Sequence, residues 1–197
     1  MKNRTKSLFA SAALLLAAAG CATQSAYVDP KGSRTVTTLG EINLQDWANA
    51  AETMVGSLRD SGAIEKSPHK PAVMAISRIV NNTSQQVDID MLVKKIRVAL
   101  SKDGKVLTTT TIGLGGQAED PLAKGLQQEA EFANDTKVTR RPDFTLSGKI
   151  IQDYARAGST RQYSFVFQLS LTDQNGLAVW EEEKTITKQG KKASVGF

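Results

Sequence analysis

The chain has 197 residues, of which 25 are Lys or Arg, 20 are Asp or Glu, and 40% are hydrophobic. This length and hydrophobic share suit one globular domain with an attached segment, and they exclude a wholly disordered chain. A single Cys and a single His exclude an internal disulfide and the usual zinc sites.

The N-terminus has the pattern of a secretory signal peptide. Residues 1–6 carry three positive charges, and residues 8–19 form an apolar run that is too short for an ordinary membrane-spanning helix. Small residues then precede the only cysteine, Cys21, in a pattern that resembles a bacterial lipobox. The sequence therefore predicts a signal peptide over residues 1–20 and a lipidated Cys21. The alternative is an ordinary signal peptide with an incidental cysteine.

The residue after the cysteine indicates the destination. It is Ala22, not the aspartate that resembles an inner-membrane retention signal, so we expect anchoring at the periplasmic face of the outer membrane. Acyl chains such as palmitate bury about 0.8 kcal/mol per CH₂ group, so several chains on one cysteine make a stable anchor. Cleavage also removes three positive charges, and we therefore expect no nucleic-acid partner.

After the cysteine the chain is predicted to contain a short tether and one domain. Residues 21–42 are polar and rich in turn residues, with a weak β-like patch over residues 35–38. A globular domain is predicted over residues 43–190, followed by a tail at 191–197. Its elements are expected as a helix at 44–58, a buried strand at 72–80, helices at 89–100 and 122–132 around a short strand at 106–111, and strands at 144–150, 163–171 and 177–187.

The order of these elements predicts an α+β fold, a small and mainly antiparallel sheet flanked by helices. Asn43 is the expected N-cap of the first helix, and Gly62 its C-terminal stop. An Asn-Gly pair at residues 175–176 predicts a hairpin between the last two strands.

The residues that could carry chemistry do not form a recognisable site. His69, the only histidine, lies in a proline-flanked loop, and the glycines at 113–116 lack the ending of a phosphate-binding loop. The sequence therefore predicts no catalytic residue, no metal, no cofactor and no enzymatic activity, with a cell-wall hydrolase as a minor alternative. Basic residues could form a patch or be solvated separately: Lys94, Lys95, Arg97, Arg140, Arg141, Lys188, Lys191 and Lys192.

Four segments in order carry a family resemblance: residues 77–83, the helix at 89–100, residues 144–148 and the hairpin at 169–180. Together with the lipobox, they resemble the LpoB family of outer-membrane lipoproteins, which activate class A penicillin-binding proteins. The likeness covers residues 43–190 and implies a fold similar to the N-terminal domain of TolB.

The resemblance implies a non-catalytic lipoprotein that binds and stimulates a peptidoglycan synthase, a class A penicillin-binding protein, in the periplasm and so contributes to cell shape. Arg78, Asn81 and Asn82 are the candidate partner-binding residues, with a structural turn as the alternative for both asparagines. The domain is expected to be monomeric.

The tether departs from the long, proline-rich one of the family's best-known form. It has about 20 residues and one proline, Pro30. As a flexible chain it would span about 25 Å, and fully extended at most about 65–70 Å.

The sequence also allows a second class of function, different from that of a synthase regulator. The chain also looks distantly like the lipoprotein subunit of the curli secretion channel, which implies a structural or assembly lipoprotein of an envelope or secretion complex. That alternative predicts ordered oligomers.

Overall fold

The computed structural model describes residues 25–30, 32–112, 120–133 and 141–191. The chain divides into two compact units, Met1–Thr35 and Val36–Phe197. Residues 36–42, predicted as tether, therefore belong to the larger unit. Cys21, the signal peptide and residues 192–197 lie outside the described residues.

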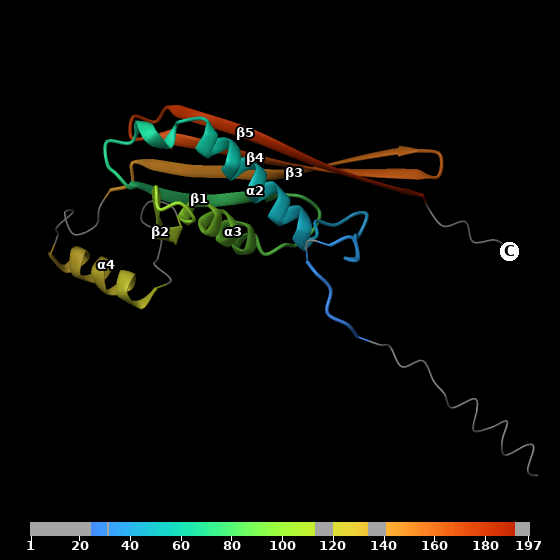
Figure 1. Cartoon of the computed structure of the whole chain (residues 1–197), viewed down its shortest axis with the longest axis horizontal. Helices are drawn as coiled ribbons and strands as arrows, with labels where there is room; N and C mark the ends of the chain where they lie inside the picture. Colours follow the sequence, from blue (N-terminus) through green and yellow to red (C-terminus); the bar gives the residue numbers. More distant parts are fainter. Residues whose placement is uncertain (1–24, 31, 113–119, 134–140, 192–197) are drawn as a thin grey trace, which may run out of the picture. The chain divides into compact units, whose positions relative to one another are not determined.

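The larger unit contains all the helices and strands that the structure describes (Figure 1). In chain order they are α2 (Leu44–Asp60), the short 3₁₀ helix η1 (Ile64–Lys66), β1 (Ala72–Asn82), α3 (Ile89–Ser101), β2 (Val106–Ile112), α4 (Pro121–Ala133), β3 (Phe144–Ala157), β4 (Thr160–Asp173) and β5 (Ala178–Lys191). Each helix and strand expected between residues 44 and 187 is present, and the last three strands are longer than predicted.

The five strands form one sheet in the order β2-β1-β3-β4-β5. β1 pairs in parallel with both β2 and β3, whereas β3, β4 and β5 form an antiparallel meander. The parallel β1–β2 pair follows from the connection through α3, because a helical crossover returns the chain to the end of the sheet where it started. The predicted α+β fold is confirmed with a mixed sheet, and the likeness to TolB stays a prediction.

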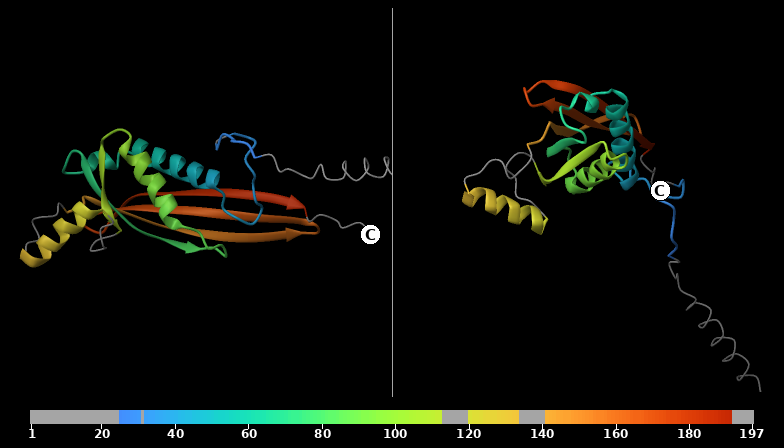
Figure 2. Two further views of the ribbon diagram at one scale, coloured as in Figure 1. Left: turned by 90° about the horizontal axis from the view of Figure 1, so that it is seen from below. Right: turned by 60° about the vertical axis from the view of Figure 1, so that its left-hand side comes forward.

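α2 and α3 lie on the same face of the sheet (Figure 2) and bury their apolar sides against it. Trp47 of α2 meets Phe167 of β4 edge to face, with ring centroids 5.7 Å apart. Burying one such large side chain stabilises the fold by about 1.5–3 kcal/mol. The largest fully buried side chains come from both layers: Met54, Leu58, Met74, Ile76, Leu92, Ile96, Leu100, Leu146, Ile150, Phe165, Phe167 and Leu171.

Both predicted ends of the first helix are confirmed. Asn43 is the N-cap, and its backbone N–H donates to the carboxylate of Asp46 in the first turn, at 2.7 Å. At the other end, Gly62 follows the C-cap with φ of 70°, a left-handed conformation that favours glycine.

The β-like patch at residues 35–38 is not a strand, so this expectation was wrong. The backbone N–H and carbonyl of Thr38 form hydrogen bonds with side chains of the domain. Its N–H donates to Oδ1 of Asn43, and its carbonyl accepts from Nζ of Lys188, at 3.1 and 3.3 Å. Lys188 also donates to the carbonyl of Glu41 at 2.6 Å and pairs with Asp46. The segment before α2 is thus fixed by Lys188 and not by pairing with a neighbouring strand.

Candidate functional site

The last part of β1 carries the residues predicted to bind a partner. Exposure alternates there, so that Arg78, Val80 and Asn82 all lie on the exposed side of the strand. In the register with β3, Val80 lies beside Lys149, and Asn82 beside Ile151. These five residues are called the β1 surface below. Side chains alternate between the two faces of a strand. Arg78, Val80 and Asn82 therefore share one face of β1, while the residues between them point to the other face.

Asn81 lies between them in sequence but has a different place. Its Nδ2 donates to the carbonyl of Gln85 at 2.8 Å, and its Oδ1 accepts from the N–H and the hydroxyl of Thr83, at 3.1 and 2.7 Å. Asn81 therefore holds the turn that follows β1, as asparagine side chains commonly do. The structure brings Arg78 and Asn82 to one exposed face and directs Asn81 into the turn.

The β1 surface combines positive charge with exposed apolar area. Val80 is 50% exposed, and Lys149 and Arg78 are both exposed cations. Within the part of the chain that the structure describes, neither cation forms an ion pair or a side-chain hydrogen bond. Such a surface is complementary to an acidic patch with an apolar centre, since charge steers the encounter and apolar contact adds affinity. Lys149 was missed as a candidate because it belongs to no motif.

The only histidine contacts a buried aspartate. His69 Nδ1 lies 2.5 Å from Oδ1 of Asp143, whose side chain has no exposed area. The other carboxylate oxygen, Oδ2, accepts from the hydroxyl of Ser67 at 2.9 Å and from the N–H of Val73 at 2.8 Å. Serine and histidine both bind the carboxylate, so the imidazole is not placed to take a proton from the serine. The cluster fastens the loop before β1 to the start of β3.

The ionisation of Asp143 reflects these contacts. Burial alone would raise the pKa of this carboxyl group. Hydrogen bonds from the N–H of Val73, from His69 and from Ser67 favour the charged form more strongly, and the pKa is lowered from its ordinary value. A negatively charged Asp143 is therefore part of the folded state at neutral pH.

Those basic residues noted in the sequence whose placement the structure describes do not form one patch. Lys94 and Arg97 line a groove between α3 and β2, whereas Lys188 is buried between β5 and the start of α2, where its side chain is 8% exposed. Arg140 and Lys192 lie outside the described residues. Among the residues with a described placement, no three His, Cys, Asp or Glu side chains are grouped to hold a metal ion. No helix in this part of the chain is long and apolar enough to cross a membrane.

Comparison with known proteins identifies one family. A family model described as "Peptidoglycan-synthase activator LpoB" matches residues 46–186. No curated protein matches the chain.

Solved structures with a similar fold include the C-terminal domains of LpoB from Escherichia coli and from Salmonella enterica. They are 16% and 15% identical to this chain, with TM-scores of 0.43 and 0.41, and each comparison covers 72% of this chain and 98% of the other. Lipoprotein GNA1162 from Neisseria meningitidis is 14% identical with a TM-score of 0.34, over 64% of this chain and 88% of that one.

Proposed function

Because the family match shows that this chain belongs to the LpoB family of peptidoglycan-synthase activators, we propose that it binds a class A penicillin-binding protein in the periplasm and stimulates glycan synthesis and crosslinking. The protein itself is proposed to be non-catalytic. In this role it is a regulator whose domain contacts the synthase and whose lipid holds it at the outer membrane.

The β1 surface is the observation that supports a docking role. Arg78 and Lys149 are exposed around Val80, and none of the hydrogen bonds and ion pairs among the described residues uses these two cations. Lys188, by contrast, is a buried cation that the domain pairs with a carboxylate of its own. We propose that an acidic patch on the synthase pairs with Arg78 and Lys149, that its apolar centre covers Val80, and that Asn82 contributes a hydrogen bond at the edge.

Stimulation requires more than docking. A bound regulator raises the activity of an enzyme only if it binds the active conformation more tightly than the inactive one. The β1 surface lies on two paired strands of the sheet and not on a loop, so the backbone positions of its residues are held in a fixed arrangement. A fixed surface of this kind can select one conformation of a partner.

The proposed anchor and the length of the tether limit how far from the outer membrane the domain can contact its partner. We propose that Cys21 is lipidated after removal of residues 1–20, and that the protein is retained at the outer membrane. Because residues 36–42 belong to the larger unit, the proposed tether runs only over residues 22–35, and fully extended it would span at most about 50 Å. The synthase is therefore expected to extend toward the outer membrane.

The test measures binding and synthesis together, with the purified protein in non-ionic detergent and the class A penicillin-binding proteins of the same organism. We expect saturable binding and faster glycan polymerisation and crosslinking. Arg78→Ala should raise the Kd by about tenfold, as expected for a charged residue that pairs with a carboxylate across an interface. Asn82→Ala should raise it by a smaller factor.

Two matched variants control for unspecific effects. Lys102→Ala removes an exposed cation from the C-terminal end of α3, and Asn49→Ala removes an exposed asparagine from α2. Both should leave binding unchanged. If no synthase binds, or if Arg78→Ala and Lys102→Ala bind equally well, the proposal is wrong. Ordered oligomers in light scattering would then support an assembly role.

A further inference from the structure

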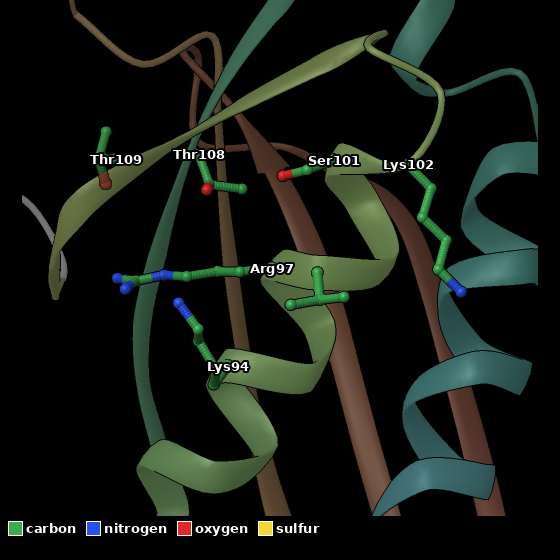
Figure 3. A pocket seen from close by; sticks show the side chains of 7 residues that line it. Lys94, Arg97, Ser101, Lys102, Thr108 and Thr109 are labelled. Atoms are coloured by element: carbon green, nitrogen blue, oxygen red, sulfur yellow. The ribbon is translucent and has the colours of Figure 1, made fainter.

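A groove of about 370 Å³ lies between α3 and the edge strand β2, and it shares no residue with the β1 surface. Figure 3 shows how its side chains are directed. Lys94 and Arg97 extend from α3 toward the same place, and the Ser101 hydroxyl points toward Thr108 of β2, whereas Lys102 extends away from them. The described lining contains cations and hydroxyl groups and no acidic residue: Lys94, Arg97, Val98, Ser101, Lys102, Thr108 and Thr109.

Arg97 is the unusual member of this lining. Its Nε and Nη2 atoms are buried and have no hydrogen-bond partner among the residues that the structure describes. They have therefore lost hydration without gaining a bond, which is unfavourable for any polar group and more so for a charged one. Lys94 adds to this cost, because it brings a second positive charge toward the guanidinium with no carboxylate among the described lining residues.

These two nitrogens are also the side-on pair of the guanidinium group. Their N–H bonds run parallel, and this is the geometry with which arginine binds two oxygens of one anion. Lys94 supplies a further donor from its ammonium, and Ser101 and Thr108 can supply hydroxyl donors. This is more donors than the two oxygens of a carboxylate use, and two positive charges match a doubly charged anion.

We propose that this groove binds a phosphate-type oxyanion, either free phosphate or a phosphomonoester group on a larger molecule such as a sugar. Because Nε and Nη2 of Arg97 are buried in the ligand-free protein, the side chain turns into the groove on binding. Two oxygens of the anion then accept from these nitrogens, and a third accepts from Lys94. Ser101 and Thr108 border the same space. The groove is larger than a phosphate ion, so the remainder of a phosphorylated sugar can lie along Val98. This site is independent of the proposed synthase contact.

The test is direct binding of two probes, inorganic phosphate and glucose 1-phosphate. Purified protein in non-ionic detergent is titrated at neutral pH and constant ionic strength, and binding is followed by ³¹P NMR of the probe. We expect saturable binding that Arg97→Gln weakens by about tenfold or more. Arg97→Lys keeps the charge but not the paired N–H groups, and its affinity should fall between the two. Arg156→Gln removes an exposed arginine of β3 with no proposed role and should leave binding unchanged.

A second measurement separates a site from a merely structural arginine. Without ligand, Arg97→Gln should melt at the same temperature as the unchanged protein or higher, because it relieves the unpaired charge beside Lys94. Phosphate should raise the melting temperature of the unchanged protein and leave that of Arg97→Gln unaffected.

The two probes distinguish the sources of the ligand. If both probes bind and Arg97→Gln weakens the binding of each, the site accepts free phosphate. If only glucose 1-phosphate binds, the site is one for a phosphorylated sugar. Failure of both probes to bind, or equal binding by Arg97→Gln, overturns the proposal. If neither probe binds and Arg97→Gln instead weakens binding of the synthase, the proposal is also overturned, and the groove belongs to a protein interface.

Discussion

Gly148 of β3 and Gln168 of β4 lie so close together that a Cβ atom at Gly148 would overlap the backbone carbonyl oxygen of Gln168. The same Cβ would lie 2.7 Å from Cδ2 of Leu169. Leu169 is buried and is the register partner of Gly148, so neither neighbour can move freely. Glycine at this position therefore allows the two central strands to approach each other.

The first prediction tests this approach. Gly148→Ala forces β3 and β4 apart and should lower the free energy of unfolding by about 2–3 kcal/mol, as overpacking of a core does. Urea unfolding measures the change. Gly56→Ala on α2 is the matched control, since nothing lies within 4 Å of the place that its Cβ would take, and it should stabilise the protein by about 0.5–1 kcal/mol. Equal effects of the two changes would contradict the prediction.

The second prediction concerns acid stability. The pKa of Asp143 is lowered in the folded protein, so its carboxylate contributes stability that is fully present above the ordinary pKa of aspartate, about 4. This contribution is lost as the pH falls from about 4 through the lowered value. The free energy of unfolding should therefore decline steeply over that range.

Asp143→Asn removes the charge and keeps the shape. It should destabilise the protein at neutral pH by about 1–3 kcal/mol, because the amide cannot accept the bonds from His69, Ser67 and Val73 together. It should also make stability less dependent on pH below about 4. Urea unfolding at a series of pH values checks both effects. Asp153→Asn changes an exposed aspartate on β3 and should alter neither the stability at neutral pH nor its pH dependence. If the stability of Asp143→Asn falls with pH as that of the unchanged protein does, Asp143 is not the group responsible.

The third prediction concerns the buried cation between β5 and α2. Lys188→Met leaves the Asp46 carboxylate without its ion-pair partner and frees the carbonyls of Thr38 and Glu41. Removal of one member of a buried pair costs about 3–5 kcal/mol, and the unfolding free energy should fall by about that amount. Lys184→Met on the same strand should change it by less than about 0.5 kcal/mol. A small loss in Lys188→Met would mean that the pair contributes little.

The fourth prediction concerns the proposed anchor. Cys21→Ala removes the only thiol, and with it the proposed lipid, and should take the protein out of the outer-membrane fraction. Cell fractionation with immunodetection measures the distribution. Arg78→Ala, which changes only the β1 surface, should stay in the membrane fraction. Retention of Cys21→Ala in the outer-membrane fraction would exclude the lipid anchor.

Local patterns in the sequence predicted most of the elements, because each is amphipathic with its own period. The stripe from Ile89 to Leu100 identified α3, and alternation from Tyr163 to Leu171 identified β4. The β3–β4 hairpin was predicted too short. Residues 153–157 of β3 are exposed, so no alternation of apolar and polar residues marks them, and they form a strand because β4 pairs with them.

The candidate sites were less predictable, because they join residues that are distant in sequence. Asp143 lies more than 70 residues from His69 and Ser67, and no spacing rule connects such residues. Arg97 was recognised as basic, but its unpaired nitrogens depend on the position of β2 beside α3. Arg78, Asn81 and Asn82 were candidates because they lie at or near the end of a predicted strand, and only the burial pattern and the hydrogen bonds of Asn81 separated Asn81 from the other two.

The bonds from Lys188 to residues 38–46 determine where a mechanical load enters the domain of a protein anchored as proposed. If the chain is pulled through the proposed anchor at Cys21, tension enters the domain near Thr38, where side chains of the domain bind the backbone. Lys188 transmits this load to β5, which is paired with β4 over almost its whole length. The first turn of α2 would thereby be protected from unwinding, so a domain anchored as proposed could be displaced without starting to unfold at the point where the load enters.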